Sequence, residues 1–229
     1  MSVLVVTGTG TEIGKTIVTA AVAAAAAQRR VAVLKPAQTG LEPGRPGDAA
    51  EVARLAGTHV TAVELARFPE PLAPATAARR AGMRPVRPYE VAEAAEKLAA
   101  DHDLVLVEGA GGLLVRFDDE GATLADAARL LAAPVLVVAP AGLGTLNSTA
   151  LTAEALRARE LDCLGVVIGS MPSAPDLAAR CNVADLPVAA GAPLLGVVPE
   201  GAGSLAPADF RARAAGWLAE PLGGHRTLG

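Results

Sequence analysis

A glycine-rich segment near the N-terminus carries two residues that could bind phosphate groups. Residues 7–16 read TGTGTEIGKT and follow a short apolar run. This order predicts a strand, a turn from Gly8 to Gly14, and a helix that begins with Lys15 and Thr16. Backbone N–H groups of such a turn can hold a polyphosphate, a lysine ammonium can reach its outer phosphates, and a threonine hydroxyl can bind Mg²⁺. Five residues separate the two glycines, one more than in the usual GxxxxGK[ST] pattern, so a plain glycine-rich turn is the alternative.

Charged side chains follow two further apolar runs. Lys35 ends the run 31–35, and Glu108 comes directly after the run 104–107. Ligands of parallel sheets collect at the carboxyl ends of strands, where a second ammonium could stabilise a phosphoryl group and a carboxylate could bind Mg²⁺. Lys35 could instead be an ordinary surface lysine. Asp48 stands at the start of a predicted helix, where it could either cap that helix or bind Mg²⁺, and its spacing does not separate the two roles.

A fourth candidate lies after the apolar run 134–139. The residues Gly144, Thr145, Leu146 and Asn147 precede or open a predicted helix. The free N–H groups at a helix start could bind a carboxylate. A threonine or asparagine at this place could equally well cap the helix and do nothing more.

These residues need a scaffold that brings strand ends together, and the rest of the pattern predicts one. Continuous apolar runs are typical of parallel strands that are covered on both faces. We therefore expect an α/β fold with a three-layer, doubly wound, mostly parallel sheet, as in P-loop NTPases, and a single domain over residues 1–229. Glycine- and proline-rich segments at 36–47 and 69–88 are expected to form a long mobile loop and a surface turn region. The predicted strands are 3–7, 31–35, 104–107, 134–139, 163–169 and 194–198, and the predicted helices are 15–28, 48–56, 74–81, 88–100, 123–132, 146–160, 175–190 and 207–219.

Composition excludes several classes of partner. Of the 229 residues, 2% are aromatic, and the formal net charge is −4, so no surface for a nucleic acid is expected. The apolar stretch 17–27 is too short to cross a membrane, and no basic segment precedes an apolar one at the N-terminus. Cys163 and Cys181 have no metal-like spacing and are expected to be unpaired thiols. Together these features favour a cytoplasmic protein without membrane or nucleic-acid partners.

Four motifs, taken in order, resemble the dethiobiotin synthetase family over nearly the whole chain. They are TGTGTEIGKT, KPAQTG, VEGAGGLLV and GLGTLNSTALTAEAL. The resemblance implies an ATP- and Mg²⁺-dependent ligase that closes the ureido ring of dethiobiotin from 7,8-diaminononanoate (7,8-diaminopelargonic acid) and CO₂. Such enzymes form a carbamate and then a carbamic–phosphoric mixed anhydride, and they release ADP and phosphate. They are homodimers that bind the substrate carboxylate at the interface.

The resemblance also implies roles for individual residues. Lys35 and Lys15 match the catalytic lysines, and Thr16, Asp48 and Glu108 match the metal ligands. Residues that match substrate positions are Thr11, Lys15, Lys35, Thr39, Gly111, Gly144, Thr145, Leu146 and Asn147. Residues that match nucleotide positions are Glu12, Ile13, Gly14, Lys15, Thr16, Ile17, Asp48, Glu108, Gly109, Ala110, Gly111, Gly169, Ser170, Pro199, Glu200 and Gly201.

The chain departs from the family at the expected base site. The resemblance implies an Asn-Asp pair after the strand that corresponds to 163–169, as in known members of this family. This chain instead has Gly169-Ser170-Met171. Since the amide that reads the base is missing, we expect weak discrimination among nucleotides, with CTP or GTP accepted beside ATP.

Two other families share part of the pattern. Partitioning and septum-site ATPases use a KGGxGKT loop, but position 10 here is Gly, and residues 220–229 form no amphipathic membrane anchor. Amidotransferases of cobalamin synthesis need a glutaminase domain with a nucleophilic cysteine, for which this chain has no room. The first of these remains the alternative.

Overall fold

The computed structural model describes residues 2–42 and 44–227, and its centre is a seven-stranded sheet. The strand order is β3-β2-β4-β1-β5-β6-β7, and all neighbouring strands pair in parallel. The strands are β1 (Val3–Gly8), β2 (Val31–Thr39), β3 (Val60–Phe68), β4 (Leu104–Gly112), β5 (Val135–Ala139), β6 (Cys163–Met171) and β7 (Leu194–Pro199).

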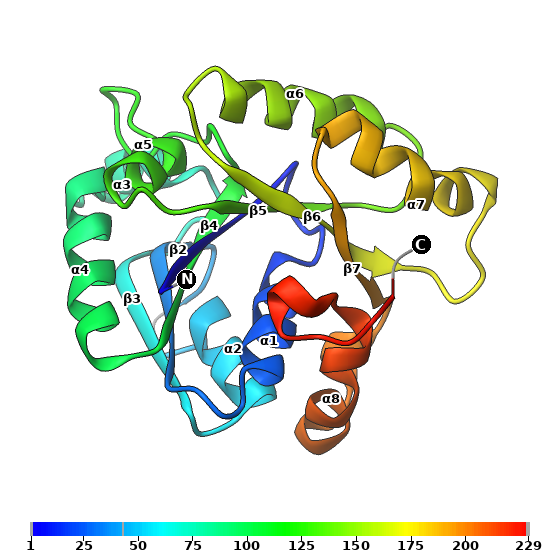
Figure 1. The fold of residues 1–229 in the computed structure, drawn as a ribbon. Helices are drawn as coiled ribbons and strands as arrows, with labels where there is room; N and C mark the ends of the chain where they lie inside the picture. Colours follow the sequence, from blue (N-terminus) through cyan, green and yellow to red (C-terminus); the bar gives the residue numbers. More distant parts are fainter. Residues whose placement is uncertain (1, 43, 228–229) are drawn as a thin grey trace.

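Helices cover both faces of the sheet, which confirms the predicted three-layer α/β fold (Figure 1). One apolar core lies between the sheet and α1 (Lys15–Ala25), α2 (Asp48–Ala56) and α8 (Pro207–Ala214). The other core lies between the sheet and α3 (Pro74–Ala81), α4 (Pro88–Asp101), α5 (Leu124–Leu130), α6 (Thr145–Arg157) and α7 (Leu177–Ala190). Short 3₁₀ turns follow at 202–204, 215–217 and 220–222. Along the described chain, no helix combines the length and apolarity that a membrane crossing requires.

The alternation of side chains along the strands determines to which face of the sheet the charged side chains of the site point. In β4, Leu104 and Leu106 face the α1 and α2 layer, while Val105 and Val107 face the opposite layer. Period-two alternation therefore turns Glu108 toward α1 and α2. Val31 and Val33 of β2 face the same layer, so Lys35 also points there.

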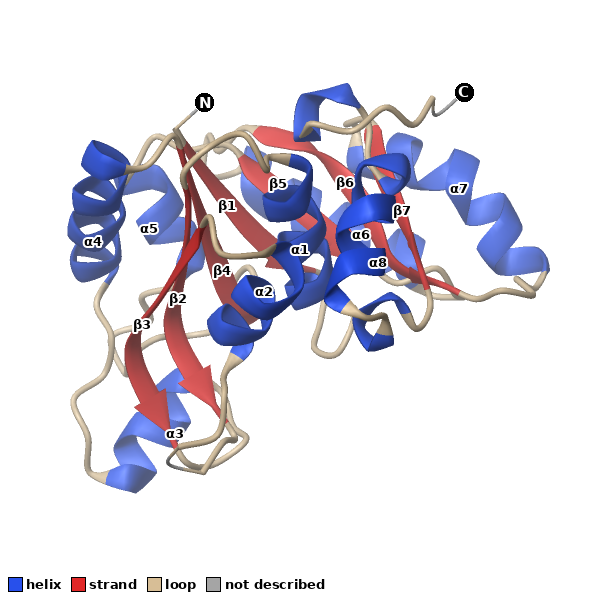
Figure 2. Ribbon diagram, turned by 90° about the horizontal axis from the view of Figure 1, so that it is seen from below, coloured by secondary structure: helices blue, strands red, loops and turns tan. Residues whose placement is uncertain are grey.

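Two strands separate at the point where these charges stand. β2 pairs with β4 only as far as Leu34 and Val107, and beyond that point it pairs only with β3. In Figure 2 the ends of β2 and β3 accordingly lie apart from those of β1 and β5. Pro36 has no N–H group, so it leaves no unpaired donor on the side from which β4 has departed. Lys35 and Glu108 are thus the first residues beyond the last β2–β4 pair.

Several predicted boundaries were wrong. β2 continues to Thr39, so residues 36–39 of the expected loop are strand, and residue 43 of that loop lies outside the described part of the chain. The strand at 60–68 was not predicted at all. β4 continues to Gly112 rather than ending at 107, so Glu108 lies within the strand. Helices α1 and α5 to α8 are shorter than expected, and α8 ends at Ala214, where a 3₁₀ turn continues to Trp217.

Candidate active site

The turn between β1 and α1 adopts a backbone suited to binding anions. Glu12 and Gly14 have φ values of 58° and 91°, in the left-handed region. Gly14 is the N-cap of α1 and no side chain caps that helix, so its first N–H groups face outward. The Lys15 ammonium folds back and donates to the carbonyl of Gly10 at 2.6 Å. Burial, and next the charge of Lys35, lower the pKa of Lys15 to about 8.

This phosphate loop packs directly against the end of β6. A Cβ atom on Gly14 would lie 2.4 Å from the carbonyl oxygen of Gly169, and a Cβ atom on Gly169 would lie 2.0 Å from the carbonyl oxygen of Ile13. Both glycines are therefore required by space, and Gly14 also by its positive φ. The contact fixes the loop relative to the sheet through backbone atoms alone.

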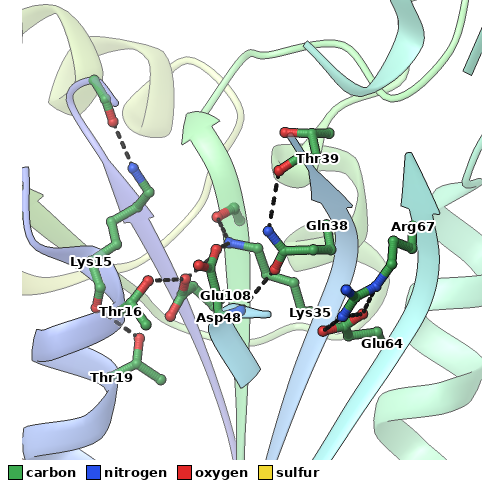
Figure 3. A network of polar contacts seen from close by, with 12 residues as sticks. Lys15, Thr16, Thr19, Lys35, Gln38, Thr39, Asp48, Glu64, Arg67 and Glu108 are labelled. Atoms are coloured by element: carbon green, nitrogen blue, oxygen red, sulfur yellow. Dashed lines mark hydrogen bonds and ion pairs between the residues drawn. The ribbon is translucent and has the colours of Figure 1, made fainter. Parts of the chain in front are cut away.

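Lys35 is the centre of a buried charge cluster (Figure 3). Its ammonium donates to Glu108 Oε1 at 2.9 Å and to the Gly109 carbonyl at 3.0 Å, and it lies 2.6 Å from Asp48 Oδ2. Burial acts to lower the pKa of Lys35, but the Glu108 and Asp48 carboxylates outweigh it and raise that pKa. Only 3% of Lys35 is exposed, so the alternative prediction of an ordinary surface lysine is wrong.

The oxygen atoms around Lys35 fit a magnesium ion. Glu108 Oε1 also accepts a hydrogen bond from Thr16 Oγ1 at 2.9 Å, while Glu108 Oε2 is buried and has no partner within the described residues. The Asp48 side chain does not cap its helix, and it is 36% exposed. Among the described residues, no three or more His, Cys, Asp or Glu side chains are grouped so that they could hold a metal ion by themselves. Two carboxylates and a hydroxyl nevertheless suit Mg²⁺, which keeps several waters and binds phosphate oxygens as further ligands.

A cavity of about 750 Å³ joins the phosphate loop to the Lys35 cluster. Of the predicted site residues, the structure brings these together around it: Thr11, Glu12, Ile13, Gly14, Lys15, Thr16, Lys35, Thr39, Asp48, Glu108, Ala110 and Gly111. The sequence analysis missed Gln38, although it stands inside the KPAQTG motif. It also missed residues 71–74, because the strand that precedes them was not recognised and its carboxyl end was therefore not examined.

The predicted base-binding residues lie together but outside this cavity. Met171 pairs with Pro199, and the Glu200 N–H donates to the Met171 carbonyl at 2.8 Å. Ser170 and Glu200 are exposed, and Gly169 contacts the phosphate loop. The segments at 169–170 and 199–201 thus form one surface next to that loop. Of the other nucleotide candidates, Ile17 packs against the α1, α2 and α8 core, and the Gly109 carbonyl binds Lys35.

The start of α6 also lies away from the cavity. Gly144 is its N-cap with a φ of 93°, and neither Thr145 nor Asn147 caps the helix through its side chain. The Thr145 hydroxyl is buried without a hydrogen-bond partner in the part of the chain that is described. Capping alone, the alternative to an anion site, therefore does not describe this segment.

Fold and site together define a P-loop NTPase. Among solved structures, the MinC:MinD cell division complex of Aquifex aeolicus aligns with a TM-score of 0.58 and 16% identity, covering 93% of this chain and 86% of that one. A ParA family ATPase of Chlorobium tepidum aligns with a TM-score of 0.55 and 15% identity, covering 92% and 90%. At these identities the likeness concerns the fold alone.

Sequence relatives identify the family within that class. A family model described as an AAA domain matches residues 2–207. The ATP-dependent dethiobiotin synthetase BioD of Streptomyces avermitilis is 73% identical over 226 residues, 98% of this chain and 94% of its own length. The protein of the same name from Saccharopolyspora erythraea is 71% identical, over 98% and 99%. The chain belongs to the ATP-dependent dethiobiotin synthetase family, which confirms the resemblance found in its motifs and makes it an ATP-dependent ligase of biotin synthesis.

Proposed function

We propose that this enzyme closes the ureido ring of dethiobiotin from 7,8-diaminononanoate and CO₂ while it converts ATP to ADP and phosphate. The observation that carries the proposal is the position of Lys35. Its ammonium lies between two carboxylates on the wall of a cavity that the phosphate loop also lines. A buried cation beside a polyphosphate site suits the transfer of a phosphoryl group to an anionic oxygen.

The reaction proceeds through two activated forms of CO₂. One substrate amine adds to CO₂ and loses a proton, which gives a carbamate. A carbamate oxygen then attacks the γ-phosphorus of ATP, the bond from that phosphorus to the ADP oxygen breaks, and a mixed anhydride forms. The second amine attacks the carbamoyl carbon and loses a proton, and phosphate leaves with the oxygen that it received. Lys15 and Lys35 stabilise the negative charge that builds up on the phosphoryl and carbamate oxygens.

Thr16, Asp48 and Glu108 are proposed to hold Mg²⁺. The support is the hydrogen bond from Thr16 to Glu108, the unpartnered Glu108 oxygen and the partly exposed Asp48 carboxylate. The ion would supply positive charge to the phosphate oxygens. Thr11, Thr39 and Gly111 line the same cavity and are proposed to contact the carbamate and the amines.

We propose a homodimer in which one copy receives the substrate carboxylate of the other at Gly144, Thr145, Leu146 and Asn147. The uncapped start of α6 supports an anion site there. A second cavity of about 340 Å³ lies between α6 and residues 112–115. Leu114 and Leu151 line it and are exposed, as is Leu143, which directly precedes Gly144.

A cytoplasmic location and a single domain over residues 1–229 stay predictions.

Nucleotide choice is proposed to be relaxed. The segment Gly169-Ser170-Met171 carries no amide side chain, whereas the family resemblance implies an Asn-Asp pair there, and the Met171 carbonyl already accepts the Glu200 N–H. The predicted base surface at 169–170 and 199–201 therefore offers few side-chain groups that could select one base. CTP and GTP are expected to support the reaction beside ATP.

Phosphate release and dethiobiotin formation test these proposals together. Purified protein is supplied with Mg²⁺, bicarbonate and 7,8-diaminononanoate, and with ATP, CTP, GTP or UTP in parallel. Release that requires the diamine and equals the dethiobiotin formed supports the ligase. Release without the diamine would favour a partitioning-type ATPase. Activity with ATP that exceeds activity with every other nucleotide by at least about a hundredfold in kcat/KM would contradict relaxed nucleotide choice.

A further inference from the structure

The N-terminus of α2 receives its cap from a neighbouring strand. Asp48 is the first residue of α2, and Gly47, its N-cap, has no side chain that could accept the free N–H groups of the first turn. The N–H of Asp48 instead donates to Gln38 Oε1 of β2 at 2.8 Å. The other end of the Gln38 amide donates to the Thr39 carbonyl at 3.2 Å, so both ends of the amide are held (Figure 3).

Neighbouring side chains, rather than backbone conformation, favour glycine at position 47. Its φ of −94° is accessible to any residue. A Cβ atom there would lie 2.2 Å from Glu64 Oε1 and 2.8 Å from Gln38 Oε1. An ordinary capping side chain such as serine or aspartate would therefore displace the groups that now support α2. The Gln38 amide takes the place of that cap because the N-cap position is left without a side chain.

A change in the alternation of β2 brings Gln38 to the same face as Lys35. Strict alternation would place residues three apart on opposite faces of the sheet. Ala37, however, packs in the same core as Leu34, so the alternation slips by one position at Pro36. Lys35 and Gln38 consequently both reach Asp48, the first through its carboxylate and the second through its backbone N–H.

Asp48 is held at two points, because its carboxylate pairs with Lys35 at 2.6 Å and its backbone N–H is bonded to Gln38. The Asp48 carboxylate makes no capping bond, and 36% of the side chain is exposed. Gln38, by contrast, is only 5% exposed, and it lies on the cavity wall. Its amide thus fixes the backbone from which a candidate metal ligand extends.

We infer that Gln38 is a positioning residue that sets Asp48 for divalent-cation binding, an inference that rests on the proposed metal role of Asp48. Groups that orient a metal ligand without touching the metal commonly change metal affinity by about 10- to 100-fold when they are removed. A residue that only capped α2 would change thermal stability and leave metal affinity alone.

The test measures Mn²⁺ binding, by electron paramagnetic resonance, to protein that carries a non-hydrolysable ATP analogue, so that no turnover is required. Gln38→Met keeps the length of the side chain and removes its acceptor, whereas Gln38→Glu keeps an acceptor oxygen. Arg54→Met is the matched control, because it removes the exposed Arg54–Glu51 pair on the same helix and leaves Asp48 untouched. Tm is measured for every variant.

We expect Mn²⁺ affinity to fall about tenfold in Gln38→Met, to stay within about threefold in Gln38→Glu, and to remain unchanged in Arg54→Met. Unchanged Mn²⁺ affinity in Gln38→Met, with or without a lower Tm, would overturn the inference. If Gln38→Met does not fold, Gln38→Asn withdraws the same amide by one methylene and carries the same comparison. Asp48→Ala distinguishes a failure of the inference about Gln38 from a failure of the proposed metal role of Asp48. Unchanged Mn²⁺ affinity in Asp48→Ala would contradict that metal role itself.

Discussion

The ammonium of Lys35 and the carboxylate of Glu108 lie 2.9 Å apart in a region from which solvent is almost excluded. A buried ion pair contributes little net stability, because the loss of hydration offsets the attraction between its charges. Removal of one partner is different, since it leaves an uncompensated charge in the interior. The pair therefore links the integrity of the fold to the chemistry of the site.

Stability measurements on neutralised variants check this link. Lys35→Met is expected to lower the free energy of unfolding by about 3 kcal/mol, because Glu108 is then buried without its cation. The double variant Lys35→Met/Glu108→Gln is expected to recover most of that loss, since it carries no unpaired charge at the two positions. Urea unfolding without nucleotide gives both values. A single variant that unfolds at the wild-type midpoint would show that the pair is not buried in solution.

The same lysine should affect catalysis more than nucleotide binding. Lys35→Met is expected to lower kcat by at least about a hundredfold, because a preorganised positive charge beside the transferred group is lost. The dissociation constant of an ATP analogue should stay within a few-fold, since Lys15 and the loop N–H groups are intact. Single-turnover rates and calorimetric titration give the two numbers. Turnover near the wild-type value would remove Lys35 from the proposed mechanism.

At the scale of elements, the phosphate loop depends on the glycine at the end of β6. Gly169→Ala is expected to weaken the binding of an ATP analogue by at least about tenfold, because its Cβ atom would lie 2.0 Å from the Ile13 carbonyl and would displace the loop. Gly216→Ala is the matched control, since its Cβ atom would lie no closer than 3.7 Å to its nearest neighbour, at His225. Calorimetric titration compares the two. Equal affinity in both variants would mean that the loop does not depend on this contact.

The sequence predicted those elements whose side chains repeat a clear pattern. β1, β4 and β5 are continuous apolar runs with buried residues on both faces, and the alanine-rich α1 packs closely on the sheet. β3 lies at an edge of the sheet, and Thr61, Glu64 and Arg67 interrupt its apolar residues at every third position, so it shows neither period-two alternation nor a continuous apolar run. Because β3 was not predicted, residues 71–74, which follow it and line the cavity, were not recognised as part of the site.

At the scale of the whole molecule, the site depends on strand order and register, which no local pattern states. Lys35 and Glu108 are 73 positions apart in the chain and meet because β2 and β4 are neighbours. The motifs indicated that both belong to one site, but the separation of the two strands and the slip at Pro36 follow from tertiary packing. The support that Gln38 gives to Asp48 was therefore beyond prediction from the sequence.

The proposed dimer can be tested by substituting exposed leucines on the surface where the two copies would meet. Leu151, on α6, borders the second cavity and is 58% exposed, whereas Leu177, on α7, is 69% exposed and lines neither of the cavities described above. A glutamate at position 151 would place a charge in the proposed contact between copies. Leu151→Glu is therefore expected to sediment as a monomer, and Leu177→Glu, which makes the same change elsewhere, as a dimer.

The two variants should also differ in their kinetic constants. If the start of α6 receives the substrate carboxylate from the other copy, Leu151→Glu should raise KM for the diamine by about tenfold or more, which corresponds to the loss of a charge-assisted hydrogen bond. Affinity for the nucleotide should not change, because the phosphate loop lies within one chain. Analytical ultracentrifugation and steady-state kinetics, each at several protein concentrations, provide both readings. A wild-type protein that is monomeric at the concentrations used for catalysis, with full activity, would contradict a shared site and place the carboxylate within a single chain.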